Sequence, residues 1–388
     1  MKRVLLSMLV NGLALTSLEA GAAEKYDLLV GTYTQGASEG LYRYAFDGAT
    51  GQIDAQPRQT LKSSNPSWLT LSQDQRRLFV VNENGPGQTE MIGKVTSFTV
   101  DGKTHEIRQV NQVETRGDEP THSSLSLDGR HLFVANYAVN ADPGGSLSVL
   151  KVAEDGTLGD VVQQLKHVAS QVNPERQAGP HVHSVVSLPP TGRYVYASDL
   201  GADRVYVYRY QPESAERPLV PAQPASVQLP DGSGPRHLLF SRDGKHAYLT
   251  LEMSGQLAMF DVQDGNLVRQ QLLELSSVGK ESASGALHLS VDGRFLYVSN
   301  RGTANELLVF SVDSTTGQLA EIQRRHVDGD HPREFTLDPT GHFLLIANQK
   351  SNQITVLKRD ASTGMLGETV QRFAQDSPSD VKFLTLGQ

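Results

Sequence analysis

Two histidines that are one residue apart are the first candidates for chemistry in this chain. They stand in the segment GPHVHS, residues 179–184. In a strand, His181 and His183 would face the same side, as a pair of zinc ligands could. Imidazole also exchanges protons near neutral pH, so the pair could equally belong to a metal-free acid–base site. The motif alone does not decide between these possibilities, because paired histidines also occur as plain scaffold.

The phrase that contains these histidines recurs along the chain. Each copy has a short strand, a tight turn and a second strand rich in Val, Leu, Phe and Tyr, and three copies turn at Asp-Gly, a strong hairpin signal. A third strand with alternating apolar and polar residues follows, and a weaker fourth fits the remainder. The six copies are residues 65–83, 119–137, 179–200, 234–252, 284–301 and 331–349.

The two ends of the chain supply one further copy, split in half. Residues 25–47 match the second half of a copy, and residues 376–386 match the first half. Pairing the C-terminal strand with N-terminal strands would close a ring and remove the exposed edges. The pattern therefore predicts an all-β protein, a seven-bladed β-propeller of four-stranded blades, formed as one domain by residues 24–388.

Alignment of the copies collects polar residues at the start of each blade. One column, four residues before the residue that precedes the turn, holds His122, His183 and His237. In this alignment His181 falls where other copies carry proline. The first strand of each blade lines the central channel of a propeller, and the second strand returns to the same end. We therefore expect these columns to surround one mouth of the channel. The neighbouring column and the ends of the second strands add Arg236, Arg333, Tyr137, Glu252 and Arg301.

The N-terminus and the composition limit the location and the partners. Residues 1–23 have a basic start, an apolar stretch and small residues before the expected cleavage point, which predicts a signal peptide and a periplasmic protein. The alternative is an uncleaved membrane anchor, but the apolar stretch is shorter than the ~20 residues that span a bilayer. The net charge of −8 argues against nucleic acid and anionic membranes as partners. There is no cysteine and hence no disulfide framework. Nothing in the pattern specifies an oligomeric state.

Several phrases resemble the lactonase family of seven-bladed propellers, which includes propeller-type 6-phosphogluconolactonases and carboxymuconate lactonizing enzyme. The most specific are GPRHLLFSRDGKHAYLTLE and SNRG, and the resemblance extends over essentially the whole mature chain. It implies a hydrolase that opens a cyclic ester. The family's catalytic positions, carried over at the matching phrases, are His183, Arg236, Glu252 and Arg301.

Lactone hydrolysis requires an activated water and stabilisation of the negative charge on the carbonyl oxygen. Glu252 is one candidate for the general base, and His183 is the competing base or the acid that protonates the ring oxygen. Arg236 and Arg301 would hydrogen-bond the oxyanion. The expected contacts to substrate or to these groups are His122, His181, His237, Arg333 and Tyr137.

Other chemistries and other substrates are alternatives to this hypothesis. Zinc takes three or four protein ligands, and no carboxylate partner for the histidine pair is assignable, so we expect no metal and no other cofactor. A nucleophile elbow of the usual kind, Gly-x-Ser-x-Gly between a strand and a helix, is not expected, because no window of the sequence looks like a long amphipathic helix. Export favours an unphosphorylated substrate, so the expected reaction is hydrolysis of glucono-1,5-lactone to gluconate. One alternative is a 6-phosphogluconolactonase with an arginine clamp for the phosphate. The other is a non-catalytic propeller that binds a protein or glycan.

Overall fold

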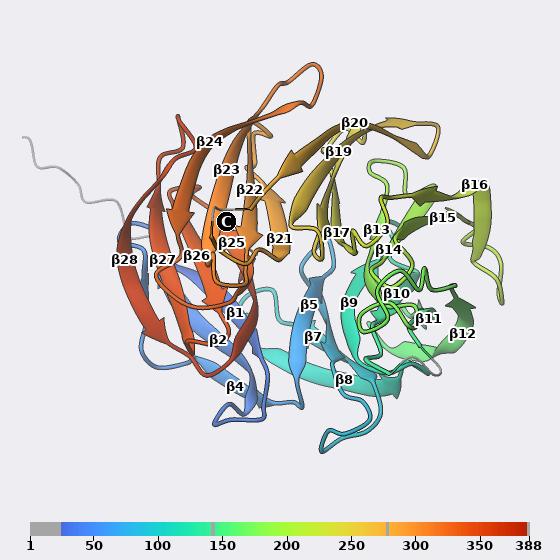
Figure 1. Cartoon of the computed structure of the whole chain (residues 1–388). Helices are drawn as coiled ribbons and strands as arrows, with labels where there is room; N and C mark the ends of the chain where they lie inside the picture. The colour runs from blue at the N-terminus through green and yellow to red at the C-terminus, as the bar shows by residue number, and fades with distance from the viewer. Residues whose placement is uncertain (1–24, 141–143, 277–278, 386–388) are drawn as a thin grey trace, which may run out of the picture.

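The computed structural model describes residues 25–140, 144–276 and 279–385. The predicted signal peptide, residues 1–23, lies outside the described residues. Seven antiparallel sheets follow one another around a ring, and the chain passes round it from blue to red in Figure 1. Within the described ranges no helix is long and apolar enough to cross a membrane. The seven-bladed β-propeller predicted from the repeats is confirmed.

We number the blades from the one that holds both chain ends. Blade 1 contains β29 (Pro378–Leu384), β1 (Lys25–Thr32), β2 (Gly40–Asp47), β3 (Gln52–Ile53) and β4 (Gln59–Lys62). Blade 2 contains β5 (Pro66–Leu71), β6 (Arg77–Asn82), β7 (Lys94–Val100) and β8 (Ile107–Glu114). Blade 3 contains β9 (Pro120–Leu125), β10 (His131–Asn136), β11 (Ser146–Val152) and β12 (Leu158–Lys166).

The remaining four blades have the same order of strands from the channel outwards. Blade 4 contains β13 (Val182–Ser187), β14 (Tyr194–Asp199), β15 (Arg204–Tyr210) and β16 (Leu219–Gln228). Blade 5 contains β17 (Pro235–Phe240), β18 (His246–Leu251), β19 (Gln256–Gln263) and β20 (Asn266–Glu274). Blade 6 contains β21 (Ser284–Leu289), β22 (Phe295–Asn300), β23 (Glu306–Val312) and β24 (Leu319–His326). Blade 7 contains β25 (Pro332–Leu337), β26 (Phe343–Asn348), β27 (Gln353–Arg359) and β28 (Leu366–Ala374).

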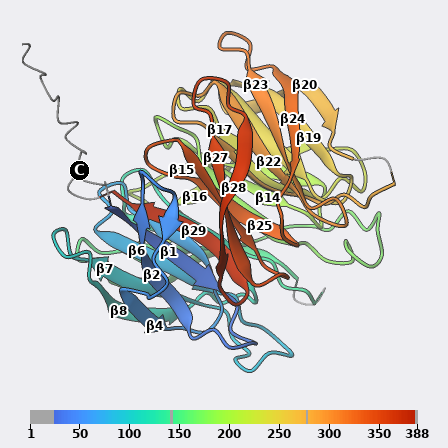
Figure 2. The same cartoon turned by 90° about the vertical axis from the view of Figure 1, so that its left-hand side faces the viewer.

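Blade 1 closes the ring as the split copy predicts. The C-terminal β29 pairs antiparallel with β1, with Leu28 opposite Phe383 and Val30 opposite Val381. Figure 2 shows β29 beside β1, where the two ends of the described chain meet. The outermost strand of this blade is interrupted, because β3 and β4 both pair with β2. In the described residues the closure pairs β29 with β1, so the innermost strand of blade 1 is paired like those of the other six blades.

The turns between first and second strands share a hydrogen-bond pattern made by a serine and an aspartate. In blade 3 the Ser126 hydroxyl donates to Asp128 at 2.6 Å and accepts the His131 N–H at 3.0 Å. Blades 2, 5 and 6 repeat this arrangement with their own serine and aspartate. Gly129 follows with a φ of 73°, a left-handed conformation that glycine adopts without strain. The Ser-x-Asp-Gly pattern thus sets the register of the first two strands.

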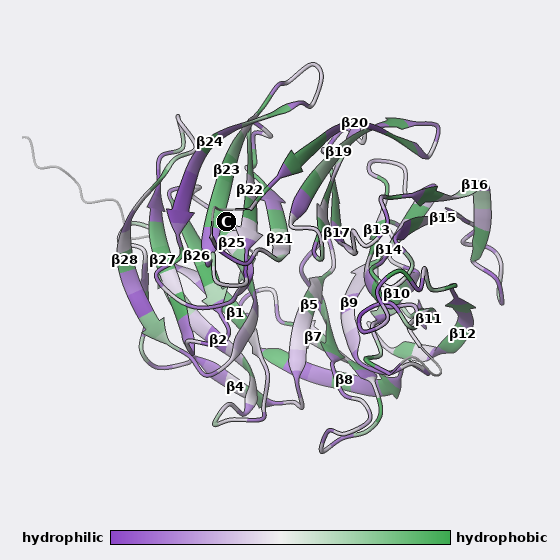
Figure 3. Cartoon of the chain, in the orientation of Figure 1, coloured by the Kyte–Doolittle hydropathy of each residue, from purple (hydrophilic) through white to green (hydrophobic). Residues whose placement is uncertain are grey.

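Apolar side chains fill the spaces between neighbouring blades. Three equivalent tyrosines on the second strands, Tyr196, Tyr248 and Tyr297, are at most 1% exposed. Each donates its hydroxyl hydrogen to a glycine carbonyl of the next blade, at 2.8–3.0 Å. The outer strands are more polar, and β8 and β24 are largely purple in Figure 3. The core is therefore a ring of inter-blade layers that holds the inner strands in fixed positions.

Candidate active site

One end of the channel is built from the residue that precedes each first strand and the residue that follows each second strand. In all seven blades the residue after the second strand donates its main-chain N–H to the carbonyl of the residue before the first strand. In blade 5, for example, Glu252 donates to Gly234 at 2.7 Å. This pairing confirms that the ends of the second strands return to the starts of the first strands. The seven donors are Tyr33, Glu83, Tyr137, Leu200, Glu252, Arg301 and Gln349.

A cavity of about 160 Å³ opens at this end, and we call it the mouth cavity. Five of the residues that the sequence predicts for the site line it, and Arg236 lies below them in the channel. A much narrower space beneath it, about 10 Å³, shares His183 and Arg333 with the mouth cavity. The mouth cavity is lined by Glu83, Glu119, Thr121, Tyr137, Val139, His183, Glu252, Arg301 and Arg333.

Glu252 is the carboxylate on which the arginines converge. Its Oε2 accepts hydrogen bonds from Arg236 Nε at 3.0 Å and Arg301 Nη2 at 2.6 Å. Its Oε1 accepts one from Arg176 Nη2 at 2.9 Å. The side chains of Arg236 and Arg301 are only 2% and 7% exposed, whereas that of Arg176 is 45% exposed. Two of the three guanidinium groups are therefore fixed inside the protein, and the third reaches in from the surface.

The charges of this cluster determine which groups can exchange protons. Burial by itself raises the pKa of Glu252, but Arg301 and Arg236 hold that pKa well below the ordinary glutamate value. Burial, with Arg301 close by, lowers the pKa of Arg236 to about 9, so its guanidinium stays protonated at neutral pH. A carboxylate with so low a proton affinity is a weak base. Glu252 is better suited to orient the two arginines.

His183 lies between the mouth cavity and the narrow space beneath it. It is 6% exposed, and its Nδ1 has no hydrogen-bond partner among the described residues. Burial, with Arg236 nearby, lowers the pKa of His183 well below its usual value. The imidazole is therefore neutral at pH 7 and can accept a hydrogen bond from a bound molecule.

The predicted column for His183 is wrong by one residue. Leu188, not Ser187, donates its N–H to the first residue of the second strand, as Ser126 does in blade 3. Its partner is Tyr194 O, because the turn that contains Pro189 and Pro190 begins one residue later. His183 therefore occupies the column of Thr121, Arg236 and Arg333, and the histidine column of the alignment has Ser184 in this blade.

The same shift places His181 just before the proline position rather than on it. Its Nδ1 lies 2.9 Å from the carbonyl oxygen of Tyr137, and its ring stacks on that of Tyr137 at 4.7 Å. The main-chain N–H of His181 donates a hydrogen bond to the Asp199 carboxylate. His181 is thus a neighbour of the mouth cavity that supports Tyr137, and its ring does not line the cavity.

The other two predicted histidines lie deeper in the channel. His237 lines the narrow space, with its Nε2 3.2 Å from Arg236 Nη1. His122 packs against Trp68, with ring centroids 4.2 Å apart and the ring planes tilted by 31°, and lines a different pocket at the other end of the channel. The structure therefore does not bring His122 into the mouth cavity with His183.

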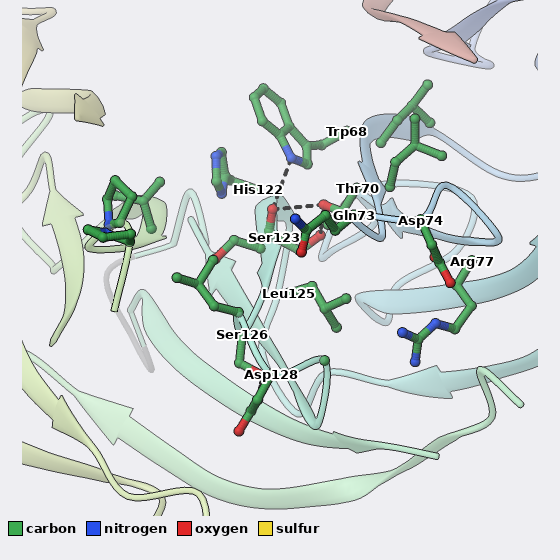
Figure 4. Close-up of a pocket in the computed structure, with 18 of the residues that line it drawn as sticks. Trp68, Thr70, Gln73, Asp74, Arg77, His122, Ser123, Leu125, Ser126 and Asp128 are labelled. Atoms are coloured by element: carbon green, nitrogen blue, oxygen red, sulfur yellow. Dashed lines mark hydrogen bonds between the residues drawn. The ribbon is translucent and has the colours of Figure 1, made fainter. Parts of the chain in front are cut away.

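That second pocket has a volume of about 1000 Å³, and Figure 4 shows its lining. It is lined by the first strands β5 and β9 and by turns between first and second strands, which lie at the opposite end of these strands from the mouth cavity. Trp68 Nε1 and Thr70 Oγ1 both donate to the Ser123 carbonyl, at 3.1 and 2.8 Å (Figure 4). We call this the turn-side pocket.

Three charged residues of the site escaped prediction. Glu83 pairs with Arg333 at 3.3 Å and accepts a hydrogen bond from the Tyr33 hydroxyl at 2.8 Å. Its position at the end of a second strand was the available signal. Glu119 precedes β9 and so lies just outside the aligned columns, and Arg176 lies in the long connection between β12 and β13, where no repeat places it.

The residues also bear on metal binding. In the part of the chain that the structure describes, no three His, Asp or Glu side chains come together as a metal site requires. The two histidines of GPHVHS have different surroundings, since His181 bonds a backbone carbonyl and His183 lines the cavity. The chemistry that this arrangement supports is stabilisation of an oxyanion by two fixed arginines beside a neutral imidazole.

Comparison with known proteins agrees with this geometry. The model of the family described as "Lactonase, 7-bladed beta-propeller" matches residues 27–383. The chain belongs to the lactonase family. The predicted family is therefore confirmed, and so is the prediction of a hydrolase that acts on a cyclic carboxylic ester.

Named relatives of this lactonase cover it almost completely. Among solved structures it is similar to the periplasmic gluconolactonase PpgL of Pseudomonas aeruginosa, with 52% identity and a TM-score of 0.91, over 94% of this chain and 100% of that one. It is 31% identical over 363 residues to a 6-phosphogluconolactonase of Formosa agariphila, covering 92% of this chain and 99% of the relative. It is 30% identical over 364 residues to a 6-phosphogluconolactonase of Bacillus subtilis, covering 93% and 99%.

Proposed function

We propose that the protein is a periplasmic, metal-independent gluconolactonase that hydrolyses glucono-1,5-lactone to gluconate. The observation that carries this proposal is the pair of buried arginines, Arg236 and Arg301, held on one oxygen of Glu252 beside neutral His183. The volume of about 160 Å³ is below the ~300–1,000 Å³ of pockets for drug-sized ligands, which suits one small ring. The similarity to the periplasmic gluconolactonase and the predicted signal peptide support the choice of substrate and location.

Each residue of the cluster has a distinct part in the proposed reaction. Water attacks the carbonyl carbon, and negative charge forms on the carbonyl oxygen. This oxygen accepts hydrogen bonds from Arg236 and Arg301. Glu252 keeps these donors in place, so little reorganisation is needed as the charge develops. His183 accepts a hydrogen bond from the water and orients it. Breakage of the ring C–O bond, with one water proton passing to the ring oxygen, then gives the open-chain acid.

A 6-phosphogluconolactonase is the second candidate, because two named relatives carry that activity in their names. Arg333 and Arg176 are the cations that would receive a phosphate. However, each already pairs with a carboxylate, Arg333 with Glu83 and Arg176 with Glu252. A phosphate would have to displace these pairs, which makes the neutral lactone the better match.

A comparison of two substrates tests this proposal. Initial rates on glucono-1,5-lactone and on 6-phosphoglucono-1,5-lactone are measured with purified mature protein, with and without EDTA, and corrected for spontaneous hydrolysis. We expect a higher kcat/KM for the unphosphorylated lactone and no effect of EDTA. The Arg301→Met protein, purified in parallel, is the control for contaminating lactonases. No acceleration over the spontaneous rate would refute the function, and a higher kcat/KM for the phosphorylated lactone would replace it with the second candidate.

A further inference from the structure

Three carboxylates line the mouth cavity, and they differ in the cations around them. Glu252 accepts from three arginines, and Glu83 pairs with Arg333. Within the described part of the chain, Glu119 forms no ion pair. It is therefore the one carboxylate of the cavity whose charge no neighbouring cation balances.

Glu119 is nevertheless held in a defined position. It is 6% exposed, and its Oε2 accepts the main-chain N–H of Val139 at 2.5 Å. Its Oε1 is 3.3 Å from Gln88 Nε2. Its Cγ would lie 2.7 Å from a Cβ added at Gly85, so that glycine leaves the space the side chain occupies. These contacts fix the carboxylate at the cavity wall with neutral donors only.

We propose that Glu119 is a further catalytic residue of the lactonase reaction: its carboxylate accepts a proton from the attacking water and then returns it to the ring oxygen. This inference rests on the proposed lactone hydrolysis. As the bond between the water oxygen and the carbonyl carbon forms, one water proton moves to Glu119. As the ring C–O bond breaks, that proton moves to the departing ring oxygen, which becomes a hydroxyl. The carboxylic acid so formed then ionises and releases one proton to solvent.

The electrostatic surroundings of Glu119 suit proton exchange. Burial, together with the nearby carboxylates of Glu83 and Asp118, raises the pKa of Glu119 above the ordinary glutamate value. The hydrogen bond from the Val139 N–H lowers this pKa but does not cancel the increase. The pKa of Glu252 is shifted the other way by its arginines. Two carboxylates of one site whose environments move their pKa values apart commonly divide acid–base and electrostatic roles between them.

Glu119→Gln is the direct test, because the amide keeps an oxygen for Val139 and removes the base. We expect kcat on glucono-1,5-lactone to fall by about 10²-fold or more, with KM changed little. The acid limb of the pH profile of kcat/KM, where Glu119 becomes protonated, should disappear. Glu119→Asp should recover part of the activity. Asp118→Asn is the matched control, because Asp118 is the adjacent carboxylate and does not line the cavity. Its kcat should stay close to wild type and its acid limb should remain, moved to lower pH because one charge that raises the pKa of Glu119 is gone.

The outcomes separate this inference from the proposed function. A wild-type protein no faster than spontaneous hydrolysis would refute the function and the inference together. An active wild type with Glu119→Gln within about threefold in kcat, and an unchanged acid limb, would overturn the role of Glu119 alone. If Glu119→Gln does not fold, Glu119→Asp and Gly85→Ala take its place, since both displace the carboxylate. Lower kcat in both would support the role, and wild-type kcat in both would overturn it.

Discussion

The two ends of the channel differ in size and in charge. The turn-side pocket has a volume of about 1000 Å³, against about 160 Å³ for the mouth cavity. Its charged lining residues, Asp74, Arg77, Asp128 and Arg242, form no ion pair with one another in the described chain. The mouth cavity, together with the buried Arg236 beneath it, brings together six charged side chains and the imidazole of His183.

The candidate site is therefore identified by the convergence of charged side chains and not by the volume of the cavity. In the turn-side pocket, polar groups such as Ser126 and Asp128 bond to one another within the turn. At the mouth, buried charges must be balanced by one another, which requires precise placement. Burial of charged groups costs desolvation energy, and clusters of this kind are typical of functional sites.

The largest effect should come from removing a fixed guanidinium at the mouth. Arg301→Met loses one of the two oxyanion donors, and we expect kcat/KM on glucono-1,5-lactone to fall by about 10²–10³-fold. The matched control is Arg242→Met in the turn-side pocket, which should stay within about twofold. Steady-state rates with both proteins, at equal folded concentration, measure the difference. Equal losses in the two variants would contradict the contrast between the two ends.

A histidine pair gives a second, smaller comparison. His183→Gln removes the neutral imidazole of the mouth cavity, and we expect kcat to fall by about 10²-fold. His122→Gln changes the equivalent chemistry in the turn-side pocket, so it should alter kcat by less than about threefold. The sequence alignment placed both histidines in one column, so this experiment also tests the corrected register. A larger loss for His122→Gln than for His183→Gln would contradict the assignment of the active site to the mouth cavity.

Both ends share one property, which predicts a modest effect on stability. Burial lowers the pKa of His122 to about 3 and lowers the pKa of His183 and His237 well below their usual value. Below pH ~6.5 the unfolded chain binds protons that the folded state does not, so the free energy of unfolding falls as pH falls, by about 1.4 kcal/mol per pH unit for each histidine.

Urea unfolding between pH 6 and pH 5 measures this dependence. His122→Gln should reduce the decrease by about 1.4 kcal/mol per pH unit, because one such histidine is gone. His326→Gln is a suitable control, since that side chain is 56% exposed. If His122→Gln kept the full wild-type slope, His122 would have to titrate alike in the folded and unfolded states.

The sequence was sufficient for the fold because the fold repeats. Asp-Gly turns, alternating strands and the split copy at the ends specify seven blades, and each signal is local or periodic. The same repeats brought Glu252 and Arg301 to the mouth, since second strands must return to the starts of first strands. Only the turn with Pro189 and Pro190 disturbed this scheme, because it begins one residue later and so moves the preceding residues of that copy, His183 among them, by one position.

The ring of blades, the family and the end of the channel at which Arg236, Glu252 and Arg301 meet could all be predicted from the sequence. Which side chains share the cavity became clear only from the folded structure. It separated His122 from His183, brought Arg176 in from a long connection, and left Glu119 without a cation. These relations depend on packing between blades and on irregular loops, where no repeat constrains the residues, and so they become visible only when the chain is folded.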